Sequence, residues 1–349
     1  MSMIDFAPSP DSVPNPVPAA PSRPAPVARL PGLDALRAIA AVCVVVMHVG
    51  PIYRTPEVLD SAYLAVDFFF LLSGFVMART YEQRMRSGRI GPWRFLWLRY
   101  LRLWPTMAVG ALLSLPFLWR DGMSWSIAAN VGLPNFFLLP TRSAPVIFAL
   151  NLPAWSVFFE LVANCAHGLF VQRLGKRTLA LLVAGLLGAL GLCAWQFGNL
   201  DLGSRPENVV GGLARVAFSY ALGILLWRFH GDRAPFAIPP VLAFLAMPVL
   251  FAAAQGFGFE GPFFDVAFVA VAGPLMLWGG LRSRAMEPLA RRVGALSFPL
   301  YAVHFPVLLA AEATGISRYL APFLALACAL VTQAAVRRFE HRLKAILTF

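Results

Sequence analysis

Long apolar runs separated by charged or loop-forming residues dominate the pattern of this chain. Windows of about 20 apolar residues, the length that crosses a bilayer as a helix, recur along the sequence near 33–50, 61–80, 97–119, 153–172, 177–197, 209–229, 237–255, 261–280, 293–313 and 319–336. The pattern therefore predicts an all-α, polytopic integral membrane protein with about ten transmembrane helices. A shorter apolar stretch at 125–140 is interrupted by Pro134, so we interpret it as an interfacial or re-entrant segment.

The composition agrees with this pattern and excludes an ordinary soluble domain. Hydrophobic residues make up 59% of the 349 residues and charged residues only 13%, whereas soluble domains carry about 25% charged residues. Residues 1–31 differ, because they hold nine prolines among small residues and no long apolar run. We expect a disordered cytoplasmic arm at 1–31, lacking the features of a signal peptide, and one membrane domain at 32–349.

Basic residues are distributed unequally between the two sides of the predicted membrane domain. With the N-terminus inside, 22 of the 29 Lys and Arg residues fall at cytoplasmic loops or inner helix ends. Six fall on the outer side, namely Arg54, Arg120, Arg142, Arg205, Arg215 and Arg318. This positive-inside bias predicts that both termini face the cytoplasm (N-in, C-in) of the inner membrane. It also accounts for the net charge of +12, so the basic character does not call for a nucleic-acid partner.

The first apolar run contains two ionisable residues, Arg37 and His48. An ionisable group within a membrane span is costly unless it faces protein or water. Eleven residues correspond to about three helical turns, so both side chains lie on one stripe, about 16 Å apart along the helix axis. Both are therefore candidates for a functional site. The alternative is that Arg37 extends to the inner interface and that His48 caps the outer end of the helix.

Three further polar residues lie inside later spans. Asp67 and Glu160 each fall in the outer third of a span that runs inward, at a depth comparable with that of His48. A carboxylate at this depth either orients and charges the histidine or is the partner of an arginine. His304 falls near mid-membrane, where a packing histidine bonded to a neighbouring helix explains it as well as a catalytic one.

Arg99 and Arg102 lie at the inner end of the third apolar run. They are three residues apart and share a helix face. One interpretation is a basic belt that only sets topology. Because both continue into the apolar run, and because guanidinium groups match phosphate geometry, we favour a cytoplasmic anion site.

The cysteines and the absence of repeats limit the alternatives. All four cysteines fall in apolar runs without C-x-x-C spacing, and we interpret them as core residues rather than disulfide partners or metal ligands. We therefore expect no metal site. The sequence shows no internal repeat, which is the usual pointer to a secondary transporter.

Five motifs resemble those of the membrane acyltransferase 3 family, bacterial O-acyltransferases that modify surface polysaccharides and related glycans. Arg37 and His48 match its Arg-x10-His pattern, and Arg99 and Arg102 match its Arg-x-x-Arg. The remaining matches are to "VDLFFVLSGF" at Val66–Phe75, "WSLSVE" at Trp155–Glu160 and "SYxLYLxH" at Ser297–His304. The resemblance covers everything except the proline-rich arm. It departs after Glu160, where the family's second carboxylate and its aromatic residue are absent.

The resemblance implies transfer of an acyl group, most often acetyl, from cytoplasmic acyl-coenzyme A to a hydroxyl of an extracytoplasmic or lipid-linked glycan. Acyl-coenzyme A is then a co-substrate, with no bound cofactor, and the partners are membrane lipids and the glycan acceptor. It implies a catalytic set of His48, Asp67 and Glu160, donor binding by Arg37, Arg99 and Arg102, and support from Ser73, Trp155, Tyr301 and His304. The alternative function is a secondary transporter or a flippase-like component of a polysaccharide assembly system.

Overall fold

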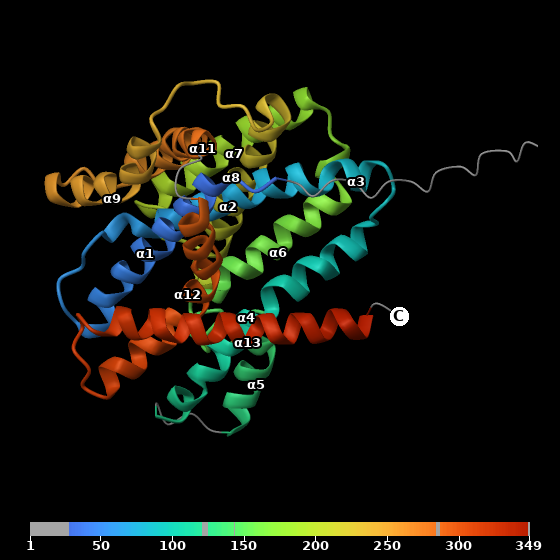
Figure 1. The fold of residues 1–349 in the computed structure, drawn as a ribbon. Coiled ribbons are helices and arrows are strands. Elements are labelled where there is room, and N and C mark those ends of the chain that lie inside the picture. Colours follow the sequence, from blue (N-terminus) through green and yellow to red (C-terminus); the bar gives the residue numbers. More distant parts are fainter. Residues whose placement is uncertain (1–27, 121–124, 143, 284–286, 348–349) are drawn as a thin grey trace, which may run out of the picture.

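The computed structural model describes residues 28–120, 125–142, 144–283 and 287–347, and these residues form helices and no strands. Nearly all of the predicted proline-rich arm lies outside the described residues. The helices, shown in Figure 1, are α1 (Pro31–Tyr53), α2 (Ala65–Met77), α3 (Gln83–Arg86), α4 (Pro92–Arg120), α5 (Trp125–Phe136), α6 (Ala154–Leu169), α7 (Lys176–Phe197), α8 (Val209–His230), α9 (Pro240–Phe257), α10 (Pro262–Ala267), α11 (Gly273–Arg282), α12 (Glu287–Ala313) and α13 (Ala321–Leu347).

Short irregular turns join some of these helices into longer rods. A 3-10 turn at Asp60–Leu64 leads into α2, and a π-helical turn at Ala78–Glu82 joins α2 to α3. A second π-helical turn at Phe268–Ala272 joins α10 to α11. Because such turns frequently occur at functional sites, the one at Ala78–Glu82 is notable for its position beside the cavities described below.

Within the described residues, eight helical stretches are long and apolar enough to cross a membrane. They are Pro31–Tyr53, Asp60–Arg86, Lys176–Phe197, Pro206–His230, Pro240–Phe257, Pro262–Arg282, Glu287–Ala313 and Ala321–Phe339. The predicted third and fourth spans coincide with α4 and α6, which are not among the eight. Helix α6 has only 16 residues, and α4 carries arginines along its first third. The all-helical membrane architecture is confirmed, whereas the count of ten spans and their orientation stay predictions.

The core of the bundle is built on pairs of closely packed helices. Helix α1 packs along α12, α2 along α8, and α12 also contacts α4 and α13 (Figure 1). Small residues make the α2–α8 contact close: a Cβ on Gly74 would lie 2.0 Å from the carbonyl oxygen of Tyr220, and one on Gly223 would lie 2.1 Å from that of Leu71. Packing of this kind is characteristic of helix pairs in membranes. This close approach of α2 and α8 explains why residue 74 is a glycine.

A buried polar cluster ties the end of α2 to α6 and α8. Glu82, in the π-helical turn, forms an ion pair with Arg228 of α8. Its carboxylate also lies 3.3 Å from Nε2 of His167, and Nδ1 of His167 lies 3.0 Å from the hydroxyl oxygen of Tyr220. A buried carboxylate is tolerated only with such partners. The cluster therefore fixes the position of the π-helical turn against its neighbours.

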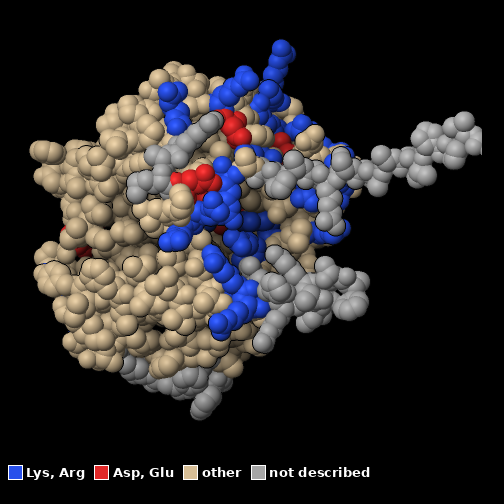
Figure 2. Space-filling view, in the orientation of Figure 1, with Lys and Arg blue, Asp and Glu red and all other residues tan. Residues whose placement is uncertain are grey.

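Lys and Arg side chains gather on one side of the bundle. In Figure 2 these basic side chains lie on the side of the bundle that holds α3 and the turn from α3 to α4. The opposite side, where α1 ends, is largely uncharged in this view. A positive-inside topology requires a one-sided distribution of this kind.

The topology predicts opposite labelling of two exposed positions. Ser87 follows α3 on the basic side, and Glu207 precedes α8 at the other end. The four native cysteines are first replaced. The variant Glu207→Cys should then react with an impermeant thiol reagent on intact cells, and Ser87→Cys should react only after lysis. The reverse result would invert the topology and move the donor site described below to the outer face.

Candidate active site

A hollow enclosed by α1, α2, α4, α6 and α12 holds most of the polar residues singled out in the sequence. Its deeper part, which we call the inner cavity, has a volume of about 330 Å³. The polar residues that line it are Arg37, Ser73, Thr80, Tyr81, Arg99, Arg102, Ser156, Glu160, Ser297 and Tyr301. Four of the five sequence motifs, and the arginine of the fifth, thus converge on one space, although they lie far apart along the chain.

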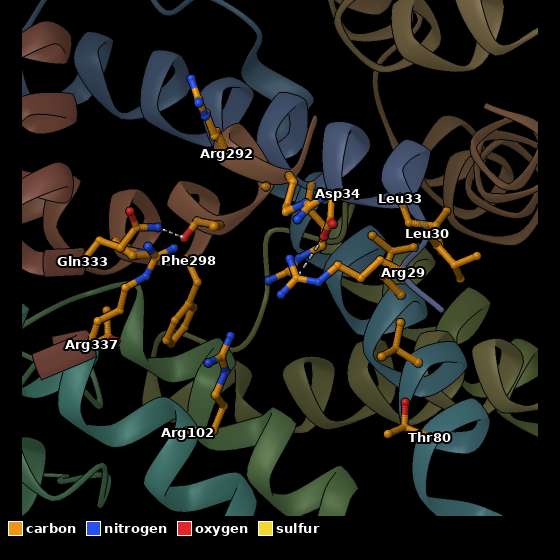
Figure 3. Close-up of a pocket in the computed structure, with 18 of the residues that line it drawn as sticks. Arg29, Leu30, Leu33, Asp34, Thr80, Arg102, Arg292, Phe298, Gln333 and Arg337 are labelled. Atoms are coloured by element: carbon orange, nitrogen blue, oxygen red, sulfur yellow. Dashed lines mark hydrogen bonds and ion pairs between the residues drawn. The ribbon is translucent and has the colours of Figure 1, made fainter. Parts of the chain in front are cut away.

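A larger cavity adjoins the inner one on the basic side of the bundle. This arginine cavity, of about 800 Å³, shares with the inner cavity the lining residues Arg37, Leu72, Val76, Thr80, Arg102 and Phe298. Among the described residues, seven arginines contribute to its wall, namely Arg29, Arg37, Arg79, Arg102, Arg291, Arg292 and Arg337, against one carboxylate, that of Asp34. Figure 3 labels four of these arginines together with Asp34. The two cavities therefore form one hollow that is strongly positive at its wider end.

Glu160 anchors an ion pair at the inner cavity. Its Oε1 accepts hydrogen bonds from Oγ of Ser73, at 2.6 Å, and from a terminal nitrogen of Arg99, at 2.8 Å. Three helices, α2, α4 and α6, each supply one of these residues. Within the part of the chain that the structure describes, Nε of Arg99 is buried with no hydrogen-bond partner. An orphaned charged donor beside a cavity is costly, so it marks a position where a bound acceptor would be stabilised.

Arg37 and Arg102 differ from Arg99 in that they line both cavities. The guanidinium of Arg37 lies 3.8 Å from the carboxylate of Asp34, one turn earlier in α1, and its side chain is 37% exposed. Arg37 and Arg102 thus stand where the two cavities meet. A polyanionic ligand in the wider cavity with one arm in the narrower one would pass between them.

Tyr301 and Ser156 close the far end of the inner cavity. Their hydroxyl oxygens are 2.7 Å apart, and both lie near the carbonyl oxygen of Pro153, at 3.3 Å and 3.0 Å. The ring of Tyr301 is 5.8 Å from that of His304, one turn further along α12. Tyr301 therefore connects the end of the inner cavity to the histidine pair described next.

His48 and His304 form a pair at the end of α1. Nδ1 of His48 lies 2.8 Å from the carbonyl oxygen of Val44, and Nδ1 of His304 lies 2.8 Å from that of Tyr301. A carbonyl oxygen only accepts, so Nδ1 carries the proton in each neutral ring. Nε2 of His304, 3.4 Å from Nδ1 of His48, then acts as an acceptor. Nε2 of His48 is left with a free lone pair on a half-buried ring.

The carboxylates expected to orient His48 have other partners in the structure. Glu160 is held by Arg99 and Ser73, as described above. Asp67 is fully buried and accepts hydrogen bonds from Arg215 of α8, the shortest at 2.6 Å. For His48, the hydrogen-bond partners found among the described residues are Val44 and His304. Each carboxylate is the partner of an arginine, which is the second of the two interpretations that the sequence left open. Backbone carbonyls orient the histidine rings instead.

Arg215 is the residue whose place in the buried core sequence reasoning missed. The basic-residue pattern predicts only that it lies on the outer side, and the structure shows that its side chain is 0% exposed. Besides Asp67, its guanidinium donates to the backbone carbonyls of Tyr63 and Leu202, each at 2.8 Å, and lies 5.1 Å from the ring centre of Trp155. The signal was present, because Arg215 lies inside the apolar run 209–229, where an ionisable residue requires a partner. Trp155 therefore packs against the buried guanidinium of Arg215, and its supporting role in the site stays a prediction.

The loop that follows α1 folds back against the last turns of that helix. A Cβ on Gly50 would lie 2.9 Å from Cα of Glu57. A hydrogen bond to Asp60, followed by partial burial and the nearby negative charges of Asp60 and Asp201, raises the pKa of Glu57 to about 7. Glu57 is therefore protonated over much of the range below neutral pH, which lowers the negative charge at this end of the molecule.

The class of the chain comes from its match to a family model, and one curated relative is also similar to it. A family model described as an acyltransferase domain matches residues 30–335. A curated relative described as protein 2 in the picA locus of Rhizobium radiobacter is 33% identical over 186 residues, which cover 47% of this chain and 94% of the relative. No solved structure is significantly similar to the chain.

Proposed function

Because the chain belongs to the acyltransferase 3 family, we propose that it transfers an acyl group, acetyl in the simplest case, from coenzyme A to a hydroxyl of a glycan across the inner membrane. The observation that carries the proposal is the hollow itself. It is positive at its wide end, joins the smaller inner cavity where Arg37 and Arg102 line both, and ends at hydroxyl groups one helical turn from a histidine pair.

The wide end suits the donor, because acyl-coenzyme A is a polyanion with phosphates at one end and a thioester at the other. Guanidinium groups bind phosphates through paired hydrogen bonds. With the phosphates in the arginine cavity, the acyl arm extends into the inner cavity, past Arg102 and toward Tyr301. This places the thioester near the end of the hollow that faces His48.

In the proposed reaction, Nε2 of His48 takes the proton from the acceptor hydroxyl as its oxygen attacks the thioester carbonyl carbon. The C–O bond forms, the C–S bond breaks, and the coenzyme A thiolate leaves and receives a proton. The hydroxyl of Tyr301, at the end of the inner cavity, is suited to donate a hydrogen bond to the oxyanion that develops on the carbonyl oxygen. Nε2 of His304 contacts Nδ1 of His48 and so keeps the His48 ring in place.

The direct test is to supply radiolabelled acetyl-coenzyme A to the purified protein in lipid nanodiscs together with glycan fractions from the producing cells. We expect label on a glycan, and free coenzyme A in equal amount. Label that crosses the membrane of a proteoliposome as intact acetyl-coenzyme A, with none on a glycan, would support a transporter and contradict the proposal.

Arg102→Lys is expected to weaken binding of coenzyme A by about tenfold, because lysine keeps the charge but loses the planar pair of donors. Arg99→Lys should have a smaller effect, since Glu160 already holds that guanidinium. Titration of coenzyme A into the nanodisc protein measures both. Arg89→Lys is the matched control, because Arg89 is exposed and lines neither cavity. Equal affinity in all three variants would leave Arg99 and Arg102 with a role in topology alone.

A further inference from the structure

The geometry of the arginine cavity points to a nucleotide site: we propose that Arg29 and Arg337 hold the 3′-phosphate of coenzyme A, so that the protein discriminates against thioester donors that lack it. The inference rests on the proposed function and adds two residues outside every motif discussed above. Arg29 immediately precedes α1, and Arg337 lies on α13.

Three separate segments bring guanidinium groups to one space. Figure 3 places Arg29, Arg102 and Arg337 around the open part of the arginine cavity, on the segment before α1, on α4 and on α13. Gln333, one turn before Arg337, donates to the carbonyl oxygen of Ala295 at 2.6 Å. That bond joins α13 to α12 and fixes the turn that carries Arg337 against the cavity wall.

The positive charge at this end is not balanced by carboxylates. Three other arginines of the wall have carboxylate partners, in the pairs Arg37–Asp34, Arg79–Asp232 and Arg291–Glu287. Among the residues that the structure describes, neither Arg29 nor Arg337 forms an ion pair, although Asp34 is near enough to Arg29 for a longer-range attraction. Like charges that converge without counter-ions repel one another, and a bound anion removes this repulsion.

The position of the two residues selects which phosphate they meet. Arg29 and Arg337 line the arginine cavity and not the inner cavity, whereas Arg102 lines both. In coenzyme A the 3′-phosphate lies on the ribose, at the end remote from the sulfur, and the diphosphate lies between. A donor with its thioester near Tyr301 therefore presents the diphosphate to the narrow passage and the 3′-phosphate to the far wall.

The size of the cavity is compatible with this occupant. A volume of about 800 Å³ lies within the range of roughly 300 to 1,000 Å³ that is usual for small-molecule sites. Because Arg29 and Arg337 are exposed at the rim, their attraction for phosphate is screened by salt. The preference for the 3′-phosphate should therefore decline as ionic strength rises.

The test compares coenzyme A with 3′-dephospho-coenzyme A, titrated into full-length protein in nanodiscs of zwitterionic lipid. We expect the wild type to bind coenzyme A about tenfold more tightly, as one charge-assisted contact allows. The double variant Arg29→Ala/Arg337→Ala should bind both ligands equally, and the loss should appear as a raised KM for acetyl-coenzyme A. The control Arg89→Ala should retain the preference. Thermal unfolding of each variant confirms that it is folded.

Two outcomes separate failure of this inference from failure of the proposed function. A double variant that keeps the full preference, with acyl transfer intact, overturns the 3′-phosphate assignment alone. A wild-type protein that binds neither ligand overturns the coenzyme A donor itself. An anionic lipid headgroup has the same phosphate chemistry, so native mass spectrometry from nanodiscs with added cardiolipin is the second measurement. Lipid retention that falls in the double variant, with unchanged nucleotide preference, assigns the arginines to lipid and overturns the inference.

Discussion

Replacing His48 with alanine is expected to lower the rate of acyl transfer by about a hundred- to ten-thousandfold, the usual range for loss of a general base. The ring is half-buried at the end of α1 and its Nδ1 bonds a carbonyl of its own helix, so its removal should leave expression and donor binding close to wild type. Transfer of labelled acetyl groups measures the rate, and titration of coenzyme A measures donor binding.

The variant His48→Gln tests which property of the ring matters. Glutamine retains hydrogen bonding but neither takes up a proton near neutral pH nor carries an acyl group. We expect it to be as inactive as the alanine variant. His304→Gln should be milder, because His304 contacts only the Nδ1 side of His48. Wild-type transfer by His48→Gln would refute the assignment and make His304 the next candidate.

The helices were predictable from the sequence because their signals are local. Apolar runs of sufficient length identified the stretches that became α1, α7, α8 and α9, and the structure places these helices within a few residues of the predicted bounds. Helix α4 shows where the reasoning is weaker. Its arginines make its first third polar, so hydropathy alone does not decide how much of the helix lies in the membrane.

The partners of the buried polar residues were not predictable in the same way. The rise per residue gives the depth of a side chain within a span, but it says nothing about which helix lies beside it. Asp67 and His48 share a depth, yet Asp67 bonds Arg215, which lies 148 residues away. His304 and His48, 256 residues apart, are neighbours because α1 packs along α12. Lateral packing depends on long-range contacts such as the Gly74 and Gly223 crossing of α2 and α8.

Removing the guanidinium of Arg215 is expected to destabilise the protein by about 3–5 kcal/mol, because it leaves the carboxylate of Asp67 buried without its charge partner. Both side chains are 0% exposed. The variant Arg215→Met keeps most of the side-chain volume and removes the charge. It also removes the bonds to the carbonyls of Tyr63 and Leu202, so the loop before α8 should loosen together with the start of α2.

The double variant Asp67→Leu/Arg215→Met decides whether this ion pair is structural or takes part in the reaction. Replacing both partners by apolar residues of similar size is often neutral for stability, so we expect the double variant to recover most of the unfolding temperature lost in Arg215→Met. Acyl transfer measured on the same preparation gives the second answer. Since Asp67 contacts Arg215 and Ser219 rather than His48, we expect transfer to recover along with stability. A double variant that is as stable as wild type but inactive would instead return Asp67 to the catalytic set. Asp67 would then act on His48 in a different conformation of the protein.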